Sequence, residues 1–379
     1  MHDQLQFMGR RIISKDSHGD PAKRSRLWSH DEILKVLQHG TGMQIVEGIL
    51  FSSDMCIDDL SFEDFAKMPN LRFIDGLSGG KIFNGDFPHL LSRLRWFRWR
   101  RFPLKILPIN FYHEELVHLD LSSSVISVAW SDKPQNKNKR FQKLKVLILS
   151  SCLDLSGSID FFSWFPCLQR LDLSNCMSLV ELPDSICEIT SLKSLILNNC
   201  ESINKLPMSI GNLKHLVELS VSETKIEELP DGVGHLQKLE KLDVSCCRKL
   251  VRLPTSMGRM GSLLHFNLEY TMIEKLPDDF SKLLSLEVLR MGMVELDDQI
   301  DYKRLQPLLI SMSAFSRLQE LYLKGYMNLE SLPELPPTLI RLKVEKCISL
   351  QIISDLSHLE MLEKLSLYDA KSLVRLPDL

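Results

Sequence analysis

The stretch from Ser178 to Pro207 reads SLVELPDSICEITSLKSLILNNCESINKLP and contains its own echo. It opens with SLVELP and closes with SINKLP, and Cys200 stands between the two phrases. The middle part, from Leu192 to Leu197, has the form Leu-x-x-Leu-x-Leu, where x is a variable residue. A chain that repeats one phrase at a regular interval is expected to repeat one structural unit.

The form Leu-x-x-apolar-x-apolar recurs along most of the chain. The interval from Leu168 to Leu192 occurs again from Leu192 to Leu216, and it is typical of the chain. This period and residue order are similar to those of leucine-rich repeats, which are about 20–29 residues long. Strict copies begin at Leu94, Leu116, Leu144, Leu168, Leu192, Leu216, Leu239, Leu263, Leu286, Leu318, Leu339 and Leu362, and a weaker copy begins at Leu71.

Each letter of the repeat has a physical explanation. In LQRLDLSNC, Leu168 to Cys176, the leucines point inward from a short parallel strand and most variable residues face solvent. Cys176 fills a tight interior position after the strand. Leu182-Pro183 suits an extended return, because proline lacks a backbone donor and disfavours helix in its predecessor. We therefore predict an α/β fold: a leucine-rich-repeat solenoid with a curved parallel sheet and short 3₁₀ or extended convex legs.

Two intervals are longer than the others. The step from Leu116 to Leu144 exceeds the usual period and holds the basic loop SDKPQNKNKRFQK. The step from Leu286 to Leu318 is longer still and holds ELDDQIDYKRLQPLLISMS, which has a partly helical pattern. Insertions in a solenoid form loops on one face. These loops are either solvated or in contact with a partner, and the sequence leaves both interpretations open.

Composition limits the class of protein. The 379 residues are 44% hydrophobic and 25% charged, which predicts a folded chain with a large core. The formal net charge of −3 argues against binding nucleic acid by bulk positive charge. The sequence has neither an apolar run of about 18 residues nor a secretory signal at its start. We expect a cytoplasmic or nuclear protein with no nucleic-acid or membrane partner.

Five of the nine cysteines follow the repeat instead of a disulfide pattern. The total number of cysteines is odd, and these five stand three residues after the last apolar residue of the motif. We predict that these five thiols are reduced and face the interior. They are Cys152, Cys176, Cys200, Cys247 and Cys347.

The motifs of common enzymes and metal sites are absent from the sequence. GLSGGKI, Gly76 to Ile82, resembles a phosphate-binding loop only superficially, because it is one residue short and has Ile82 where Ser or Thr is required. The sequence contains no His-Glu-x-x-His, Cys-x-x-Cys or Gly-x-Ser-x-Gly. We therefore predict no enzyme activity, no catalytic residue, no bound metal and no cofactor in this chain.

A local basic cluster, RLRWFRWRRF, runs from Arg93 to Phe102. Leu94, Phe97 and Trp99 take the core positions of the motif, which leaves Trp96 and four arginines for the surface. We favour contact with an acidic protein surface, followed by a solvated face and then by nucleic-acid binding. The candidate partner-binding residues are Arg95, Arg98, Arg100 and Arg101 in this cluster, and Arg170, Asp172, Lys193, Glu218, Lys241 and Asp243 in later repeats.

The residues before the repeats have a different pattern. MHDQLQFMGRRIISKD has helical spacing, DEILKVLQHG predicts a second short helix that ends at Gly40, and MQIVEGILFS predicts a strand. The order of MHD at Met1 to Asp3, MGRRII, PAKRSRLW and VEGILF at Val46 to Phe51 resembles plant intracellular disease resistance receptors of the TIR type. FAKMPNLRFI, LRWFRWRRFPLKILP and NFYHEELVHLDLS continue this resemblance into the repeats.

The resemblance implies two domains. Residues 1–48 would be the winged-helix end of a nucleotide-binding domain with its linker, and residues 49–379 would be about thirteen repeats, truncated at the C-terminus. His2 would contact ADP, with Asp3 as its supporting neighbour, only where a nucleotide-binding domain is present. The full-length family uses ADP or ATP, whereas we expect no nucleotide binding by this chain because it lacks a phosphate-binding loop.

The resemblance also implies a function. We predict the protein-recognition and autoinhibitory repeat domain of an intracellular plant immune receptor that acts in defence against pathogens. Its partners would be a pathogen effector or a guarded host protein, and the nucleotide-binding domain of the same receptor type. The alternative is a stand-alone binding scaffold or a truncated decoy partner of full-length receptors. An extracellular receptor is disfavoured, because the sequence lacks a signal, an Asn-x-Ser/Thr sequon and a membrane span.

Overall fold

The computed structural model describes residues 3–51, 65–79, 93–107, 111, 113–127, 141–156, 162–273, 275–293, 311–353 and 356–374. It divides into two compact units, Met1–Asp172 and Leu173–Leu379. This division reflects compactness and does not test the predicted domain boundary between residues 48 and 49, which stays a prediction.

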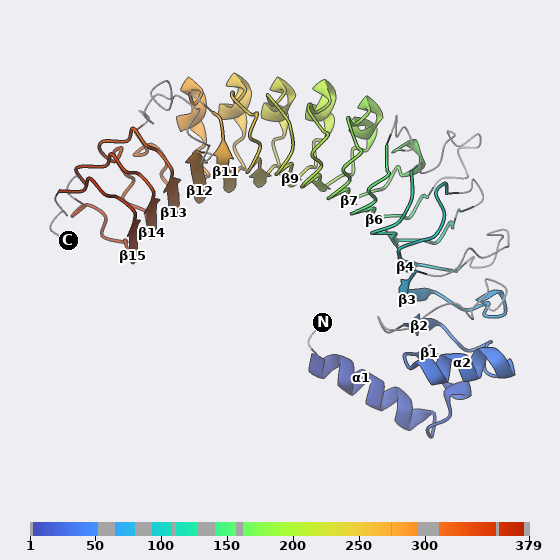
Figure 1. The fold of residues 1–379 in the computed structure, drawn as a ribbon. Helices are drawn as coiled ribbons and strands as arrows, with labels where there is room; N and C mark the ends of the chain where they lie inside the picture. Colours follow the sequence, from blue (N-terminus) through green and yellow to red (C-terminus); the bar gives the residue numbers. More distant parts are fainter. Residues whose placement is uncertain are drawn as a thin grey trace. The chain divides into compact units, whose positions relative to one another are not determined.

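The described part of the first unit contains seven parallel strands in chain order, each paired with the next (Figure 1). Two α-helices accompany the first strands. The elements are α1 (Asp3–Asp16), η1 (Pro21–Lys23), β1 (Arg26–Leu27), α2 (His30–His39), β2 (Gly48–Leu50), β3 (Phe73–Ser78), β4 (Trp96–Arg100), β5 (His118–Asp120), β6 (Val146–Ile148), η2 (Phe162–Trp164) and β7 (Arg170–Asp172).

The described part of the second unit contains eight parallel strands, again paired in chain order. Five short 3₁₀ helices alternate with its first strands. The elements are η3 (Asp184–Glu188), β8 (Ser194–Ile196), η4 (Met208–Asn212), β9 (Glu218–Ser220), η5 (Asp231–His235), β10 (Lys241–Asp243), η6 (Thr255–Arg259), β11 (His265–Thr271), η7 (Asp278–Lys282), β12 (Val288–Met293), β13 (Glu320–Lys324), β14 (Arg341–Glu345) and β15 (Lys364–Tyr368).

The repeat motif positions every strand from β3 to β15. Each of these strands begins two residues after the first leucine of its motif, as Ser194 follows Leu192 and Arg341 follows Leu339. The prediction of parallel strands at these positions is confirmed. The motif did not reveal β1, because the segment around Arg26 lacks the leucine spacing.

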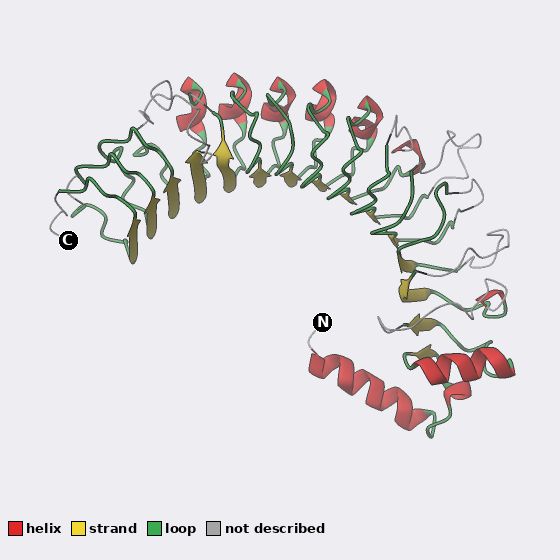
Figure 2. Cartoon of the chain, viewed as in Figure 1, coloured by secondary structure: helices red, strands yellow, loops and turns green. Residues whose placement is uncertain are grey.

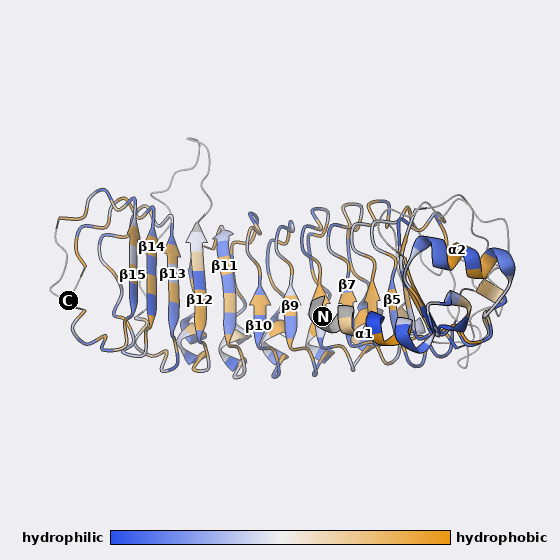
Figure 3. Cartoon of the chain, turned by 90° about the horizontal axis from the view of Figure 1, so that it is seen from below, coloured by the Kyte–Doolittle hydropathy of each residue, from blue (hydrophilic) through white to orange (hydrophobic). Residues whose placement is uncertain are grey.

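The leucines of the motif form the core of each unit. Leu192, Leu195 and Leu197 are all 0% exposed, whereas the preceding Lys193 is exposed. Figure 3 shows the alternation as hydrophilic and hydrophobic bands along the strands of the second unit, such as β13 and β14. Alternate side chains of a strand point to opposite faces, so one face of each strand joins the core and the other faces solvent.

Most of the described repeats have one residue in the left-handed region at the turn that follows the strand. Asn175, Asn199 and Glu223, seven residues after the first leucine of their motifs, have φ values of 58–59°. The backbone N–H of Asn199 donates to the carbonyl oxygen of Ser222 at 2.8 Å, and that of Glu223 donates to Ser245 at 2.9 Å. The same turn therefore hydrogen-bonds each of these repeats to the following one.

The predicted interior cysteine position is confirmed. Cys152, Cys176, Cys200, Cys247 and Cys347 are all 0% exposed. The thiol of Cys200 donates to the carbonyl oxygen of Leu173 at 3.0 Å, so the small polar side chain satisfies a backbone acceptor inside the core. None of the cysteines in the described residues forms a disulfide bond.

The Leu-Pro pairs begin the return legs, as predicted. Pro183, Pro207, Pro230, Pro254 and Pro277 are the N-cap residues of η3 to η7. Figure 2 shows these 3₁₀ helices on the opposite side of the second unit from its strands. Neighbouring legs are so close that a Cβ added at Gly234 would lie 2.3 Å from the carbonyl oxygen of Ser256.

The N-terminal elements have the secondary structure that the sequence predicted. Both predicted helices are present. Helix α2 ends at His39, and the next residue, Gly40, has the left-handed conformation. Strand β2 lies within the segment predicted as a strand. Met8 and Ile12 on α1 are exposed. These elements do not test the winged-helix assignment. Among the helices of the described residues, none is both long and apolar enough to cross a membrane.

The two predicted insertions, residues 131–143 and 295–313, lie mostly outside the described residues.

Candidate functional site

The solvent-facing side of the second-unit strands is organised in two rows. The first row consists of the residues two positions after the first leucine of each motif, and the second row consists of those four positions after it. Parallel pairing places the members of each row directly opposite one another on neighbouring strands. The first row is Ser194, Glu218, Lys241, His265, Val288, Glu320, Arg341 and Lys364; the second is Ile196, Ser220, Asp243, Asn267, Arg290, Tyr322, Lys343 and Ser366.

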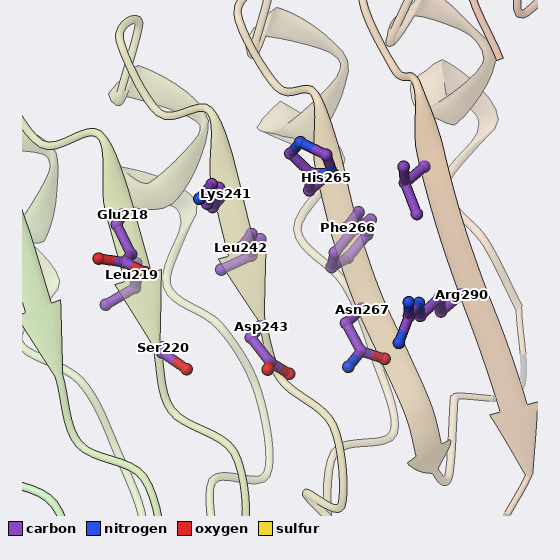
Figure 4. Close-up of a pocket in the computed structure, with 11 residues that line it drawn as sticks. Glu218, Leu219, Ser220, Lys241, Leu242, Asp243, His265, Phe266, Asn267 and Arg290 are labelled. Atoms are coloured by element: carbon purple, nitrogen blue, oxygen red, sulfur yellow. The ribbon is translucent and has the colours of Figure 1, made fainter. Parts of the chain in front are cut away.

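A depression of about 230 Å³ lies over β9 to β12 in these rows. Figure 4 shows Glu218, Lys241 and His265 along one side of it, and Ser220, Asp243, Asn267 and Arg290 along the other. Its floor includes the core residues of three strands. The depression is lined by Glu218, Leu219, Ser220, Lys241, Leu242, Asp243, His265, Phe266, Asn267, Val288 and Arg290.

Several acceptors of the depression are occupied by the chain itself. Asp243 Oδ1 accepts the backbone N–H of Ser245 at 2.9 Å, and Asn267 Oδ1 accepts that of Glu269 at 3.2 Å. Glu218 Oε2 accepts the hydroxyl of Ser194 at 2.7 Å. These bonds hold the acceptor side chains in place and leave the amide nitrogen of Asn267 available to a ligand.

The basic groups of the depression are less engaged. Within the described residues, neither Lys241 nor Arg290 forms an ion pair. The guanidinium carbon of Arg290 lies 4.7 Å from the centroid of the Tyr322 ring, a cation–π geometry. The depression is therefore polar and of mixed charge, with donors directed outward at β10 and β12.

The first unit carries a different surface, built around stacked rings. Trp96 stacks on Phe73 with 5.7 Å between ring centroids, and on His118 with 3.6 Å and nearly parallel planes. Trp96 Nε1 donates to Asp75 Oδ2 at 3.2 Å. These three rings come from β3, β4 and β5, so they form a short aromatic row across neighbouring repeats.

The arginines of the basic cluster have unequal roles. Leu94, Phe97 and Trp99 are buried, as predicted, but Arg98 forms an ion pair with the buried Asp75. Arg95 lies 3.8 Å from Glu115, which also pairs with Lys143. Arg100 and Arg101 are exposed, and no ion pair joins them to the described residues.

Burial shifts the titration of groups near this cluster. It raises the pKa of Asp75, and the neighbouring Arg98 opposes the shift. Burial also lowers the pKa of His118 to about 4 and that of His113 to about 4. Both histidines are therefore neutral at physiological pH.

The structure brings together some of the sequence-predicted partner-binding residues. Glu218, Lys241 and Asp243 line the depression. Arg98 and Arg100 lie on β4, and Arg95 and Arg101 stand immediately before and after it. Arg170 and Asp172 lie on β7 and form an ion pair of 3.4 Å, and Lys193 is exposed immediately before β8. Sequence reasoning did not single out Ser220, His265, Asn267 or Arg290, although they occupy the same motif positions.

The two residues of the predicted nucleotide contact, His2 and Asp3, have no described side chains. His2 is not among the described residues, and the side chain of Asp3 is not described. In GLSGGKI, Gly76 has a structural explanation, because its φ is 87° and an added Cβ would lie 2.2 Å from the carbonyl oxygen of Phe51. Within the described part of the chain, no group of three or more His, Cys, Asp or Glu residues could hold a metal ion.

A family model described as a leucine-rich repeat region matches residues 157–379, which is more than half of the chain.

Among curated proteins, the chain is similar to disease resistance proteins. It is 32% identical to RPP2A of Arabidopsis thaliana over 158 residues, which are 40% of this chain and 12% of that protein. It is 30% identical to TAO1 of the same plant over 171 residues, 42% and 14% of the two chains. It is 31% identical to RPV1 of Vitis rotundifolia over 198 residues, 45% and 14%. The chain thus spans about 12–14% of the length of these relatives.

Solved structures share the fold. A leucine-rich-repeat protein of Leptospira interrogans matches with a TM-score of 0.58 and 18% identity, over 86% of this chain and 85% of that chain. The functional domain of InlJ from Listeria monocytogenes, described as including a cysteine ladder, matches with a TM-score of 0.52 and 16% identity, over 92% and 68%.

Proposed function

Since this chain belongs to the leucine-rich-repeat family, we propose that it is the protein-recognition region of a plant immune receptor. Its identity of 30–32% to RPP2A, TAO1 and RPV1 supports a role in plant defence. In this proposal a pathogen effector or a guarded host protein binds the solvent-facing rows of the second unit. The receptor acts in the cytoplasm or the nucleus.

The depression over β9 to β12 is the observation that carries the proposal. Its polar lining stands on strands whose inward residues, such as Leu219, Leu242 and Phe266, are at most 1% exposed. A surface fixed by a packed core loses little conformational entropy on binding. At about 230 Å³ the depression is smaller than pockets that enclose drug-sized ligands, which measure roughly 300–1,000 Å³. A protein surface that spans several repeats is the better occupant.

An autoinhibitory contact is the second part of the proposal. Arg100 and Arg101 are the exposed members of the basic cluster, and they suit an acidic face of a nucleotide-binding domain. Partner binding at the second unit would then change this contact and shift the receptor from an inactive to an active state. The chain itself acts as a non-enzymatic scaffold in this mechanism.

Proximity labelling in leaf tissue challenged with a pathogen tests the recognition surface. The chain is expressed with a fused biotin ligase, either unchanged or with Lys241→Glu and Arg290→Glu. The matched control carries Lys214→Glu and Lys238→Glu, two exposed lysines outside the depression. We expect specific proteins to be labelled by the unchanged chain and the control, and at least about tenfold less by the depression variant.

Two results would contradict the proposal. Equal labelling by the depression variant and the unchanged chain would place recognition elsewhere. Failure of Arg100→Glu/Arg101→Glu to weaken binding to a nucleotide-binding domain supplied in trans would remove the autoinhibitory contact and leave the stand-alone scaffold as the better interpretation.

A further inference from the structure

Arg290 occupies a fixed place in the second row. On β12 it lies directly opposite Asn267 of β11 on one side and Tyr322 of β13 on the other. Its guanidinium carbon is 4.7 Å from the centroid of the Tyr322 ring. The hydroxyl of Tyr322 in turn donates to Glu320 Oε2 at 3.1 Å, which holds the ring that supports Arg290.

Two cations of β14, Arg341 and Lys343, are paired with carboxylates, whereas Arg290 has no such pair among the described residues. Lys343, on the next strand after Tyr322, lies 2.7 Å from Glu345 Oε1. Arg341 forms an ion pair with Glu320. Arg290 is exposed and has no carboxylate partner among the described residues. Its face contacts an aromatic ring, but no carboxylate of the described residues pairs with the N–H donors at its edge.

Other donors line the same depression. The amide nitrogen of Asn267 is available because its oxygen accepts the backbone N–H of Glu269. His265 of the first row lines the same depression two residues before Asn267. Lys241 lies on β10, two strands from Arg290, or roughly 10 Å along the sheet at about 4.8 Å per strand.

We propose that Arg290 binds a carboxylate side chain from an acidic segment of the protein partner, with the Asn267 amide as an additional donor. The planar guanidinium can give two parallel hydrogen bonds to one carboxylate. A second acidic residue of the segment reaches Lys241. This inference rests on the proposed function and adds the chemistry of the partner to it.

The surrounding charges favour an Asp or Glu side chain over a phosphorylated residue. Asp243 lies directly opposite Asn267, and Glu218 lies one strand further away in the first row. Asp243 is two strands from Arg290, or roughly 10 Å, which is about one Debye length at 0.1 M salt, so it repels an anion there. Glu218 is three strands from Arg290, so its repulsion is weaker. A phosphate group of charge −1.5 to −2 experiences this repulsion more strongly than a single carboxylate does.

Fluorescence anisotropy with a defined peptide tests the assignment. The probe is an end-blocked, dye-labelled hexapeptide of alternating Asp and Glu. The protein variants are Arg290→Gln, Arg290→Lys and Tyr322→Leu, and the matched control is Arg317→Gln, an exposed arginine outside the two rows that already pairs with Glu287. We expect Arg290→Gln to weaken binding about tenfold, Arg290→Lys to weaken it less, and Arg317→Gln to change it less than about twofold.

Each alternative result overturns the inference. Equal losses for Arg290→Gln and Arg317→Gln would mean that the peptide binds by general charge attraction. Tighter binding of a phosphoserine peptide of the same length, or equal binding of a peptide of alternating Asn and Gln, would reject a carboxylate ligand. No binding at millimolar concentration would reject the site. The leaf labelling experiment is independent of the peptide, so a surface-dependent partner found there would retain the proposed function without this chemistry.

Discussion

Thr224 Oγ1 and Cys247 Sγ lie 3.3 Å apart in the interior of the second unit. They occupy the same motif position in consecutive repeats, eight residues after the first leucine. Both can donate to the carbonyl oxygen of Val221, at 2.9 and 3.1 Å respectively. A buried acceptor shared in this way joins two repeats and requires a small side chain with a donor at each position.

The interior thiols should resist alkylation. Treatment of the folded protein with iodoacetamide is expected to modify the exposed Cys167 well before Cys176, Cys200 or Cys247. Burial excludes the reagent and also raises the pKa of Cys247, which lowers the fraction of reactive thiolate. Peptide mass spectrometry over a time course measures the order, and equal rates at all four cysteines would show that the interior assignment is wrong.

Leu195 and Lys193 should differ sharply in their effect on stability. Leu195 is 0% exposed, so Leu195→Ala is expected to lower the free energy of unfolding by about 2–5 kcal/mol through lost burial and a cavity. Lys193→Ala removes an exposed side chain and should change it by less than about 0.5 kcal/mol. Urea denaturation followed by circular dichroism compares the two. Similar values for both variants would contradict the strand register.

Acidification should destabilise the first unit through His113. Its pKa is lowered by burial from 6.5 to about 4 in the folded protein, so the unfolded chain binds the proton more readily. The stabilising effect is present above pH 6.5 and is lost as the pH falls to about 4, by about 3 kcal/mol in total. Urea denaturation of the unchanged chain at pH 7 and pH 5 measures it.

His113→Gln should remove part of this pH dependence, because glutamine does not titrate. His215→Gln replaces an exposed histidine and serves as the control. If the pH dependence of unfolding were the same in both variants, the neutral buried state of His113 would be refuted.

The left-handed turn residues should tolerate only certain side chains. Glu223 has a φ of 58°, where asparagine is favoured over most residues and a β-branched side chain is strained. We expect stability to fall in the order Asn, Glu, Val at this position, over a range of about 1–2 kcal/mol. Lys225→Val, at an exposed position with ordinary φ, is the control. If the Val variant at position 223 were as stable as the Asn variant, the left-handed conformation of this residue would be contradicted.

Arg100 and Arg101 should contribute more to domain contact than Arg98. Arg98 is engaged by Asp75 within the chain, whereas the other two are exposed. Reversal of Arg100 and Arg101 to Glu is expected to weaken co-precipitation with a nucleotide-binding domain about tenfold, and the binding should decline between 0.1 and 0.5 M salt. Lys214→Glu/Lys238→Glu controls for net charge. Equal binding by both double variants would favour a solvated arginine surface.

The leucine spacing was sufficient to place strands β3 to β15, because every turn of the stack buries the same positions. Leu168, Leu171 and Leu173 illustrate this, since the chain must face inward at all three positions to bury them. The Leu-Pro pairs predicted the return legs for a local reason, since proline removes the donor that a long helix would need.

The binding surface was only partly predictable. Glu218, Lys241 and Asp243 were identified from their outward positions, yet the motif treats every outward residue alike. Arg98 illustrates the limit, because its ion-pair partner, Asp75, lies on the preceding strand, one full repeat earlier in the sequence. A repeat pattern reports which side a residue faces and does not report its partner.

The sequence by itself determined the class of fold, the strand positions, the inward leucines and cysteines, and the extended or 3₁₀ return legs, since these depend on local periodicity and burial. Only the tertiary structure decided which outward side chains meet. Parallel pairing sets Asn267, Arg290 and Tyr322 side by side from three repeats. It also pairs Arg98 with Asp75 and leaves Arg290 without a carboxylate among the described residues. Such relationships arise between strands whose separation in sequence varies with each return leg, so they become defined only when the repeats stack.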